Sequence, residues 1–201
     1  FPFSRDTPLF RWEWHRVAAT GPPPPPRWAH CAADLNGEML VFGGDTLADP
    51  DDGTSDRLAD LYAFDAAGLR WRRCQDAPQG RAWHSGTSVR GSLDGASDIF
   101  LVFGGEAVKP PAKMIAAAVP KEPADAPAGS TAVPSTDRPK RTGRLQSLSS
   151  MLSFDPEFGV WYEAVDRGHR PSGRLGHSAV THDFNGGGAK LLVFGGFSHG
   201  A

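Results

Sequence analysis

Three histidines of this chain stand at matching places, and imidazole is the side chain most often used for acid–base chemistry near neutral pH. Each histidine follows an arginine by three positions, so the spacing Arg-x-x-His recurs. The copies are Arg27–His30, Arg81–His84 and Arg174–His177. A catalytic group is needed once, whereas a residue that returns in every unit of a repeat has the same duty in each. We therefore predict that His30, His84 and His177 satisfy buried backbone groups or pack within the fold.

Two clusters of acidic residues are candidates for metal sites. Glu163, Asp166 and His169 supply two carboxylates and an imidazole, which suit iron or another divalent metal. They lie where a strand leads into the third Arg-x-x-His copy, a stretch that every unit has, and this favours an ordinary connector. The second cluster lacks the alternating ligands, glycine and glutamate of an EF-hand, so we interpret it as a solvated loop. Its members are Asp45, Asp49, Asp51, Asp52 and Asp56.

The elements that would position these side chains also recur. Four or five apolar residues precede a pair of glycines in Met39–Gly44, Ile99–Gly105 and Leu191–Gly196. Such a run predicts a short strand that is buried on both faces and ends where glycine permits a positive φ or a close backbone approach. The glycines are Gly43 and Gly44, Gly104 and Gly105, and Gly195 and Gly196.

Two further elements follow the first two glycine pairs. A second apolar strand ends in Phe-Asp at Asp65 and at Asp155, and a tryptophan stands six residues later, at Trp71 and at Trp161. Together with the glycine pairs and the Arg-x-x-His segments, these features resemble the kelch repeat, in which one unit folds as a four-stranded propeller blade. The resemblance implies an all-β fold, a segment of a kelch-type β-propeller.

The same resemblance divides the chain into about two full blades and partial blades at each end. Residues 27–77 and 81–164 are expected to form full four-stranded blades, and residues 174–201 the first half of another. Residues 1–19 are expected to supply the last strand of a preceding blade, since Trp12–Val17 alternates large and polar side chains. Closed propellers typically have about four to eight blades. We therefore expect this chain to be a piece of a larger propeller.

Two segments depart from the strand pattern. Residues 107–146, between the second and third strands of the second blade, are rich in Pro, Ala, Ser, Thr and Lys, and we expect a mostly disordered insertion. Its basic cluster at Arg138–Arg144 suits a nuclear signal or a partner contact, although a solvated linker is the simpler interpretation. Pro22–Pro26 predicts a stiff polyproline connector, and a docking site for a proline-binding domain is the alternative.

Composition narrows the classes of partner. A net charge of −2 gives no basic stripe for nucleic acid, and the longest apolar runs are far too short to cross a bilayer. Cys31 and Cys74 stand at different places in the unit, so there is no repeated disulfide framework and a reducing compartment is favoured. We expect a cytoplasmic protein, with a nuclear location as the alternative, that needs no cofactor.

The loops are the expected place of recognition, because long irregular loops on a rigid scaffold usually carry it. Alternating strand direction puts the loops after the second and fourth strands of each blade on one face. We predict that this face binds another protein. The candidate contact residues on it are Asp49, Asp51, Asp52, Arg81, Arg138, Arg141 and Arg174.

The alternative is a metal-dependent enzyme similar to other kelch-like propellers. Galactose oxidases hold copper with two tyrosines and two histidines, but Tyr62 and Tyr162, the only tyrosines here, stand at regular strand positions. Plant nitrile-specifier proteins carry a Glu, Asp, His triad whose steps are each one residue wider than those from Glu163 to His169. The sequence also lacks a nucleophile elbow, a phosphate-binding glycine loop and a Cys-x-x-Cys pair. We therefore predict a binding module and not an enzyme.

Overall fold

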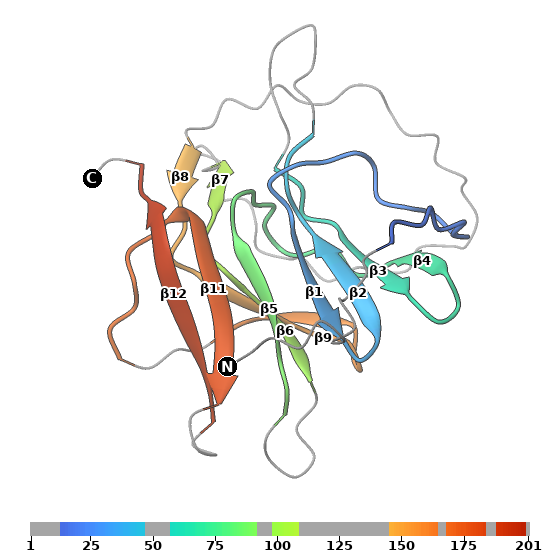
Figure 1. The fold of residues 1–201 in the computed structure, drawn as a ribbon. Coiled ribbons are helices and arrows are strands. Elements are labelled where there is room, and N and C mark those ends of the chain that lie inside the picture. Colours follow the sequence, from blue (N-terminus) through green and yellow to red (C-terminus); the bar gives the residue numbers. More distant parts are fainter. Residues whose placement is uncertain are drawn as a thin grey trace, which may run out of the picture.

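The computed structural model describes residues 13–46, 57–91, 98–108, 145–164, 168–183 and 188–199. These residues form strands and connecting segments without a helix, so the prediction of an all-β fold is confirmed (Figure 1). The strands are β1 (Cys31–Leu35), β2 (Glu38–Phe42), β3 (Leu61–Asp65), β4 (Arg70–Arg73), β5 (Ser85–Val89), β6 (Ile99–Phe103), β7 (Glu106–Val108), β8 (Leu145–Ser147), β9 (Met151–Asp155), β10 (Val160–Glu163), β11 (Leu175–Asp183) and β12 (Ala189–Phe197).

The first unit is a four-stranded antiparallel sheet in the order β1–β2–β3–β4. Asn36 and Gly37 join β1 to β2 and have φ values of 55° and 81°. Two successive positive φ angles are typical of a type I′ turn, whose twist matches that of the strands it joins. The Asn-Gly pair therefore sets the register of the first hairpin, in which Cys31 lies opposite Phe42.

The second unit is also a four-stranded sheet, in the order β5–β6–β9–β10. Between β6 and β9 the chain adds a two-stranded ribbon, β7 with β8, in which Val108 pairs with Leu145. The sequence does not predict this ribbon, which lies at the two ends of the segment 107–146. Residues 109–144 of that segment, with Arg138 and Arg141, lie outside the described residues.

The third unit contains the hairpin of β11 and β12, and it differs from the prediction that each strand ends at its glycine pair. Here β12 continues through Gly195 and Gly196 to Phe197, which pairs with Leu175. In the first two units the second glycine leaves the sheet because its N–H donates to the next unit, from Gly44 to the Arg81 carbonyl over 2.9 Å. The described residues contain no unit after the third that would accept such a bond.

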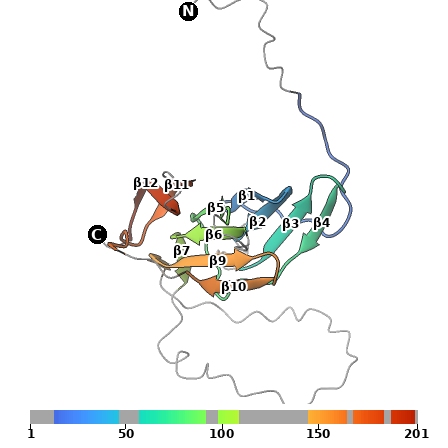
Figure 2. The same ribbon diagram turned by 90° about the horizontal axis from the view of Figure 1, so that it is seen from below.

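The predicted strand at Trp12–Val17 is wrong for the part of it that the structure describes. Residues 13–19 form no strand, and the side chain of Trp14 is fully exposed. A strand needs a neighbour for its backbone groups, and the first described residue that pairs is Thr20. Its N–H donates to the Leu69 carbonyl over 2.9 Å, and its carbonyl accepts from the Trp71 N–H at the same distance. Residues 13–19 run away from the sheets (Figure 2).

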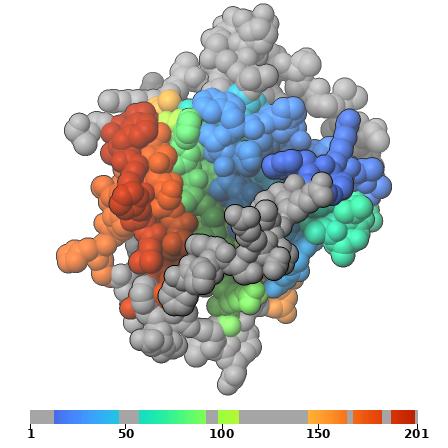
Figure 3. Space-filling model, in the orientation of Figure 1, coloured from blue at the N-terminus to red at the C-terminus, as the bar shows by residue number. Residues whose placement is uncertain are grey.

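The three units stand side by side in chain order, as the space-filling view shows from blue through green to red (Figure 3). The core lies between the first two sheets, where Phe42, Phe100 and Phe154 are almost completely buried. Trp161 of β10 packs against Phe42 with ring centroids 4.9 Å apart, and its Nε1–H donates to the carbonyl of Gln75 over 2.9 Å. Each unit is therefore stabilised mainly by burying its sheet against its neighbour.

Candidate functional site

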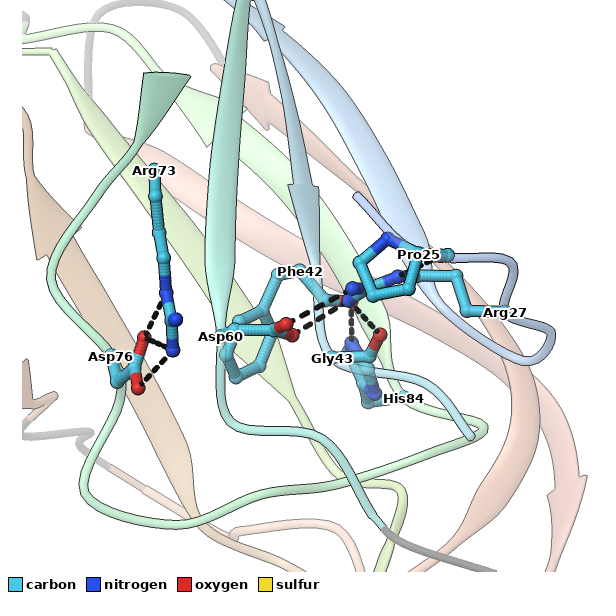
Figure 4. Close-up of polar contacts among 8 residues, drawn as sticks. All are labelled: Pro25, Arg27, Phe42, Gly43, Asp60, Arg73, Asp76 and His84. Carbon is cyan, nitrogen blue, oxygen red and sulfur yellow. Dashed lines mark hydrogen bonds and ion pairs between the residues drawn. The ribbon is translucent and has the colours of Figure 1, made fainter. Parts of the chain in front are cut away.

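The arginines of the Arg-x-x-His segments bind the glycine pair of their own unit. Arg27 donates to the carbonyl of Gly43 over 3.0 Å and forms a bidentate pair with Asp60, at 2.6 and 3.0 Å (Figure 4). Arg81 donates to the carbonyl of Gly104 over 3.2 Å, and Arg174 donates to that of Gly195 over 3.0 Å. In each unit the guanidinium thus fixes the first glycine of the pair, which directly follows the second strand in the first two units and lies within β12 in the third.

The histidine of each following unit reaches back to the preceding one. His84 donates from Nε2 to the carbonyl of Phe42 over 3.2 Å (Figure 4). His177 lies with its ring 5.3 Å from that of Phe103, and its Nε2 is 2.9 Å from the Ser85 hydroxyl oxygen. His30, in the first copy, has no unit before it in the described residues and is exposed. The two later histidines therefore join neighbouring units.

These surroundings suppress protonation of the imidazoles. Burial, and secondarily the nearby Arg81 charge, lower the pKa of His84 to about 3. Burial and Arg174 lower the pKa of His177 as well, and partial burial and Arg27 lower that of His30. A general base works best with a pKa near the operating pH. The geometry and the pKa of His84 thus favour a structural duty over proton transfer.

The first glycine is required in the first two pairs because the next unit lies against it. A Cβ atom at Gly43 would lie 2.7 Å from the carbonyl oxygen of Arg81 and 2.9 Å from Cε1 of His84. A Cβ atom at Gly104 would lie 2.8 Å from the corresponding atoms of both Arg174 and His177. The strand end, the arginine and the histidine therefore form one junction that is built twice.

The third position of the Arg-x-x-His segment has a left-handed backbone in every unit. Ala29, Trp83 and Gly176 have φ values of 52°, 59° and 66°. The Trp83 N–H donates to the Ala29 carbonyl, and the Gly176 N–H donates to the Trp83 carbonyl, both over 2.9 Å. Non-glycine residues seldom adopt this backbone, and such outliers concentrate at functional sites. Of these three residues only Gly176 is of a type that favours this backbone, so the sequence alone does not predict it.

Two tryptophans, from the second position of the first segment and the third position of the second, meet on the surface. Trp28 and Trp83 form an edge-to-face pair with ring centroids 5.4 Å apart and planes at 88°. They remain 46% and 40% exposed. Trp28 exchanges backbone hydrogen bonds with Asp45 and donates from Nε1 to the carbonyl of Thr46 over 3.3 Å. The pair is therefore a rigid aromatic patch at the start of the loop that follows β2.

Buried ion pairs connect the segments that lie next to the tryptophan pair. Arg57 forms ion pairs with Asp45 of the first unit and with Glu106 of β7. His199, from the segment after β12, approaches the other oxygen of Glu106 with its Nε2, 2.8 Å away. The side chains of Asp45 and Glu106 are nearly inaccessible. This network joins all three units and orders the strand ends around the tryptophans.

The residues predicted to contact a partner differ in whether the structure describes them and in how exposed they are. Asp49, Asp51 and Asp52, like the two arginines of the insertion, lie outside the described residues. The prediction that Arg81 contacts a partner is wrong. Arg81 is 1% exposed, because its guanidinium is buried against Gly104 and Ser150, and it offers no surface to a partner. Arg174 is only partly buried, but its guanidinium is committed to Gly195 and Ser172.

The groups considered for metal chemistry are not assembled in the described part of the chain. Tyr62 is buried with the Arg27 guanidinium 5.3 Å from its ring, whereas Tyr162 is half-exposed on β10. Asp166 lies outside the described residues, so its triad with Glu163 and His169 stays untested. Within the described ranges, no three His, Cys, Asp or Glu side chains are grouped closely enough to hold a metal ion.

The sequence predicted neither a repeated disulfide framework nor a run of apolar residues long enough to cross a bilayer. Cys31 is buried and Cys74 is partly buried, and both are free thiols. Burial raises the pKa of both. None of the described segments is a helix of the length and hydrophobicity that a membrane crossing requires.

Comparison with known proteins finds a family model and several relatives that match this chain. A family model described as the KLHDC2/KLHL20/DRC7 Kelch-repeats domain matches residues 4–116. Adagio-like protein 1 from Oryza sativa subsp. japonica is 29% identical over 191 residues, which cover 92% of this chain and 22% of that protein. Kelch domain-containing protein 2 from Bos taurus is 34% identical over 95 residues, which cover 46% of this chain and 20% of that protein.

A third relative is by its printed name a subunit of a complex. Dynein regulatory complex subunit 7 from Chlamydomonas reinhardtii is 32% identical over 103 residues, which cover 49% of this chain and 8% of that protein. The chain therefore spans less than a quarter of the length of these relatives.

Proposed function

Because this chain belongs to the kelch-repeat family, we propose that it binds another protein through the face on which Trp28 and Trp83 lie. Kelch repeats are in general modules of protein interaction, and one relative is by its printed name a subunit of a complex. That this chain binds a partner is proposed from the properties of this face. The observation that carries it is the exposed, rigidly held tryptophan pair.

The position of the pair follows from strand direction. In each full unit the first strand begins opposite the end of the second, with Cys31 opposite Phe42 and Ser85 opposite Phe103. The connectors that lead into β1 and β5 therefore share an edge with the segments that leave β2 and β6. The tryptophans belong to these connectors, next to the loops that were expected to carry recognition.

The energetics of the pair suit a binding hot spot. Tryptophan is among the residues that dominate measured interface energies, and such residues act from well-packed places near the centre of an interface. Both backbones are fixed by hydrogen bonds, at Trp28 to Asp45 and at Trp83 to Ala29. Little side-chain and backbone freedom remains to be lost on binding, which favours affinity.

The test compares the proteins that bind the full chain and two variants. Purified wild type, the double variant Trp28→Ala/Trp83→Ala and the control Phe158→Ala are each cross-linked in cell extract, and captured proteins are quantified by mass spectrometry. Phe158 is a matched control because it is 70% exposed in the β9–β10 turn, away from the tryptophans. Thermal melts of all three proteins establish that they are folded.

We expect a defined set of proteins to be captured by wild type and control, and to fall at least about tenfold with the double variant, since hot-spot truncations cost about 2 kcal/mol or more. Equal capture by the double variant would place the interaction elsewhere on the chain. Absence of any reproducible capture by wild type would remove the support for a binding module.

A further inference from the structure

We propose that Pro22–Pro26 is a preformed ligand for a protein domain whose aromatic-lined groove binds polyproline without a flanking arginine. Each proline ring fixes φ near about −65°, and a proline disfavours the helical conformation of the residue before it. Five in succession therefore form a polyproline II segment of about 15 Å. The structure shows neither helix nor strand in these residues, and the first bend after Gly21 is at Pro26.

The structure holds this segment at both ends. On one side, Thr20 exchanges two backbone hydrogen bonds of 2.9 Å with the edge of β4. On the other side, Arg27 is anchored by Asp60 and Gly43, and its Nε–H donates to the carbonyl of Pro25 over 3.1 Å (Figure 4). Polyproline grooves gain affinity from a ligand that needs no ordering, and here the scaffold adds to the stiffness of the prolines.

The exposed prolines are more than the fold requires. All three units have a proline three positions before the arginine of the Arg-x-x-His segment, at Pro24, Pro78 and Pro171. The other four places of the run are not proline in either of the later units. Pro24 is also the least exposed of the five, whereas its four neighbours are exposed. The shared proline thus serves the connector, and the additional four have no counterpart in the repeat.

The three residues per turn of a polyproline II helix explain which prolines are free. Pro22 and Pro25 lie along one edge of such a helix, Pro23 and Pro26 along a second, and Pro24 along the third. The edge with the partly buried Pro24 faces the domain, so two proline-only edges face solvent. Aromatic polyproline grooves take a ligand by two such edges. The segment therefore presents its binding surface outward.

The anchored arginine selects the kind of groove. Grooves of the SH3 type combine prolines with a basic residue beside them. Arg27 is the basic residue that follows the run, but its side chain is 3% exposed and is paired with Asp60. Arg27 cannot contact a partner unless its ion pair with Asp60 is broken. A groove that binds proline alone, such as that of profilin, meets no such obstacle.

The experiment uses the full chain with recombinant profilin as the probe, and measures the dissociation constant by calorimetry. We expect binding by wild type, competition by free poly-L-proline, and at least about a tenfold weaker interaction for Pro22→Ala/Pro23→Ala/Pro25→Ala/Pro26→Ala, in which Pro24 is kept. The control Pro78→Ala/Pro171→Ala should bind as wild type does. An arginine-dependent SH3 domain should bind at least about tenfold more weakly than profilin does.

Absence of profilin binding by wild type, equal binding by the fourfold variant, or stronger binding by the SH3 domain would overturn the proposal. If the fourfold variant does not melt cooperatively, the test uses a synthetic peptide of residues 20–28 in its place. This peptide should bind profilin, but more weakly than the folded chain does. A peptide that does not bind profilin would equally overturn the proposal. Trp83→Ala should leave profilin binding unchanged, which separates this site from the tryptophan face.

Discussion

The rings of Phe42 and His84 meet edge to face across the boundary of the first two units, with centroids 5.1 Å apart and planes at 65°. Phe103 and His177 repeat this contact at the next boundary, at 5.3 Å and 71°. Each phenylalanine ends the second strand of its unit, whereas His84 directly precedes β5 and His177 is the third residue of β11. The junction between units is thus as regular as the units, and its parts can be tested one at a time.

Replacing the first glycine of a pair tests the close approach at the junction. Gly43→Ala places a methyl group 2.7 Å from the Arg81 carbonyl oxygen, whereas Gly195→Ala meets nothing within 4 Å, although both residues have a positive φ. The strain of the left-handed backbone alone costs roughly 1–2 kcal/mol. We expect Gly195→Ala to lose about that much free energy of unfolding and Gly43→Ala clearly more, as measured by urea denaturation. Equal losses would show that the next unit does not press on Gly43.

The depressed pKa of His84 predicts an acid sensitivity of the fold. The folded protein keeps this imidazole neutral down to a pKa of about 3, while in the unfolded chain it binds a proton below its ordinary value of 6.5. The unfolded state therefore binds more protons in this window, and stability that is complete above pH 6.5 is lost as the pH falls. The loss contributed by His84 approaches about 1.4 kcal/mol per pH unit.

The matched variant for this experiment is His84→Gln, which keeps a donor but does not titrate. Denaturation of both proteins at pH 7.5, 6.5 and 5.5 isolates His84, because His30 and His177 titrate in both. We expect the wild type to be more stable at pH 7.5 and its advantage to shrink toward pH 5.5. A constant difference across this range would mean that folding does not lower the pKa of His84.

The strands of the two full units could be predicted because their signals are local. Asn36–Gly37 is a hairpin signal complete in two residues, and the apolar runs before Gly43 and Gly104 are long enough to mark central strands. The pairing of Val108 with Leu145 could not be predicted, since it joins two three-residue strands across a long insertion. The alternation in Trp12–Val17 predicted a strand wrongly, because pattern alone does not supply a neighbouring strand.

The candidate site was harder to predict than the fold. Trp28 is the second residue of its Arg-x-x-His segment and Trp83 is the third, so aligning the units does not bring them together. They meet because the left-handed backbone at Trp83 donates its N–H to Ala29 of the preceding unit. Nothing in an alanine or a tryptophan signals a positive φ. The structural role of the histidines could be predicted because the Arg-x-x-His segment is repeated in the sequence.

The burial of Val102 predicts that a charge there cannot be tolerated. This residue is 0% exposed in β6, between Gly86 of β5 and Leu152 of β9. An unpaired carboxylate in such a place costs at least about 4 kcal/mol, so Val102→Asp should abolish cooperative thermal unfolding. The control Val180→Asp, at a site that is 56% exposed, should change the melting temperature little. A melt of Val102→Asp like that of wild type would refute the placement of β6.

The ribbon at the base of the insertion predicts where that segment can be cut. Val108 and Leu145 are paired neighbours, so a short Gly-Ser linker in place of residues 109–144 closes the gap without distortion. Since loop closure changes by only about 0.6 kcal/mol per doubling of length, stability should change by less than about 1 kcal/mol. Extending the deletion to residues 107–146 removes two pairs of the ribbon and the buried Ala107, and should cost more. Equal stability of both deletions would show that the ribbon contributes nothing.

The third unit predicts the solution behaviour of this chain expressed alone. Phe194 is 84% exposed, although its counterparts Phe42 and Phe103 are 0% and 3% exposed because the next histidine covers them. Leu192 and Phe197 add to this apolar surface, being 47% and 62% exposed. Large exposed apolar patches promote association, so light scattering coupled to size exclusion should find oligomers or aggregates.

The variant Leu192→Ser/Phe194→Ser should shift this distribution toward monomer, because it removes apolar area without touching the junctions between units. Phe158→Ser is the control: Phe158 is 70% exposed but stands in a turn on another unit, and its replacement should leave the distribution as it is. A monodisperse monomer with a sharp cooperative melt would contradict this prediction. It would show that the exposed face of β11 and β12 does not drive association and that the three units are stable without another subunit.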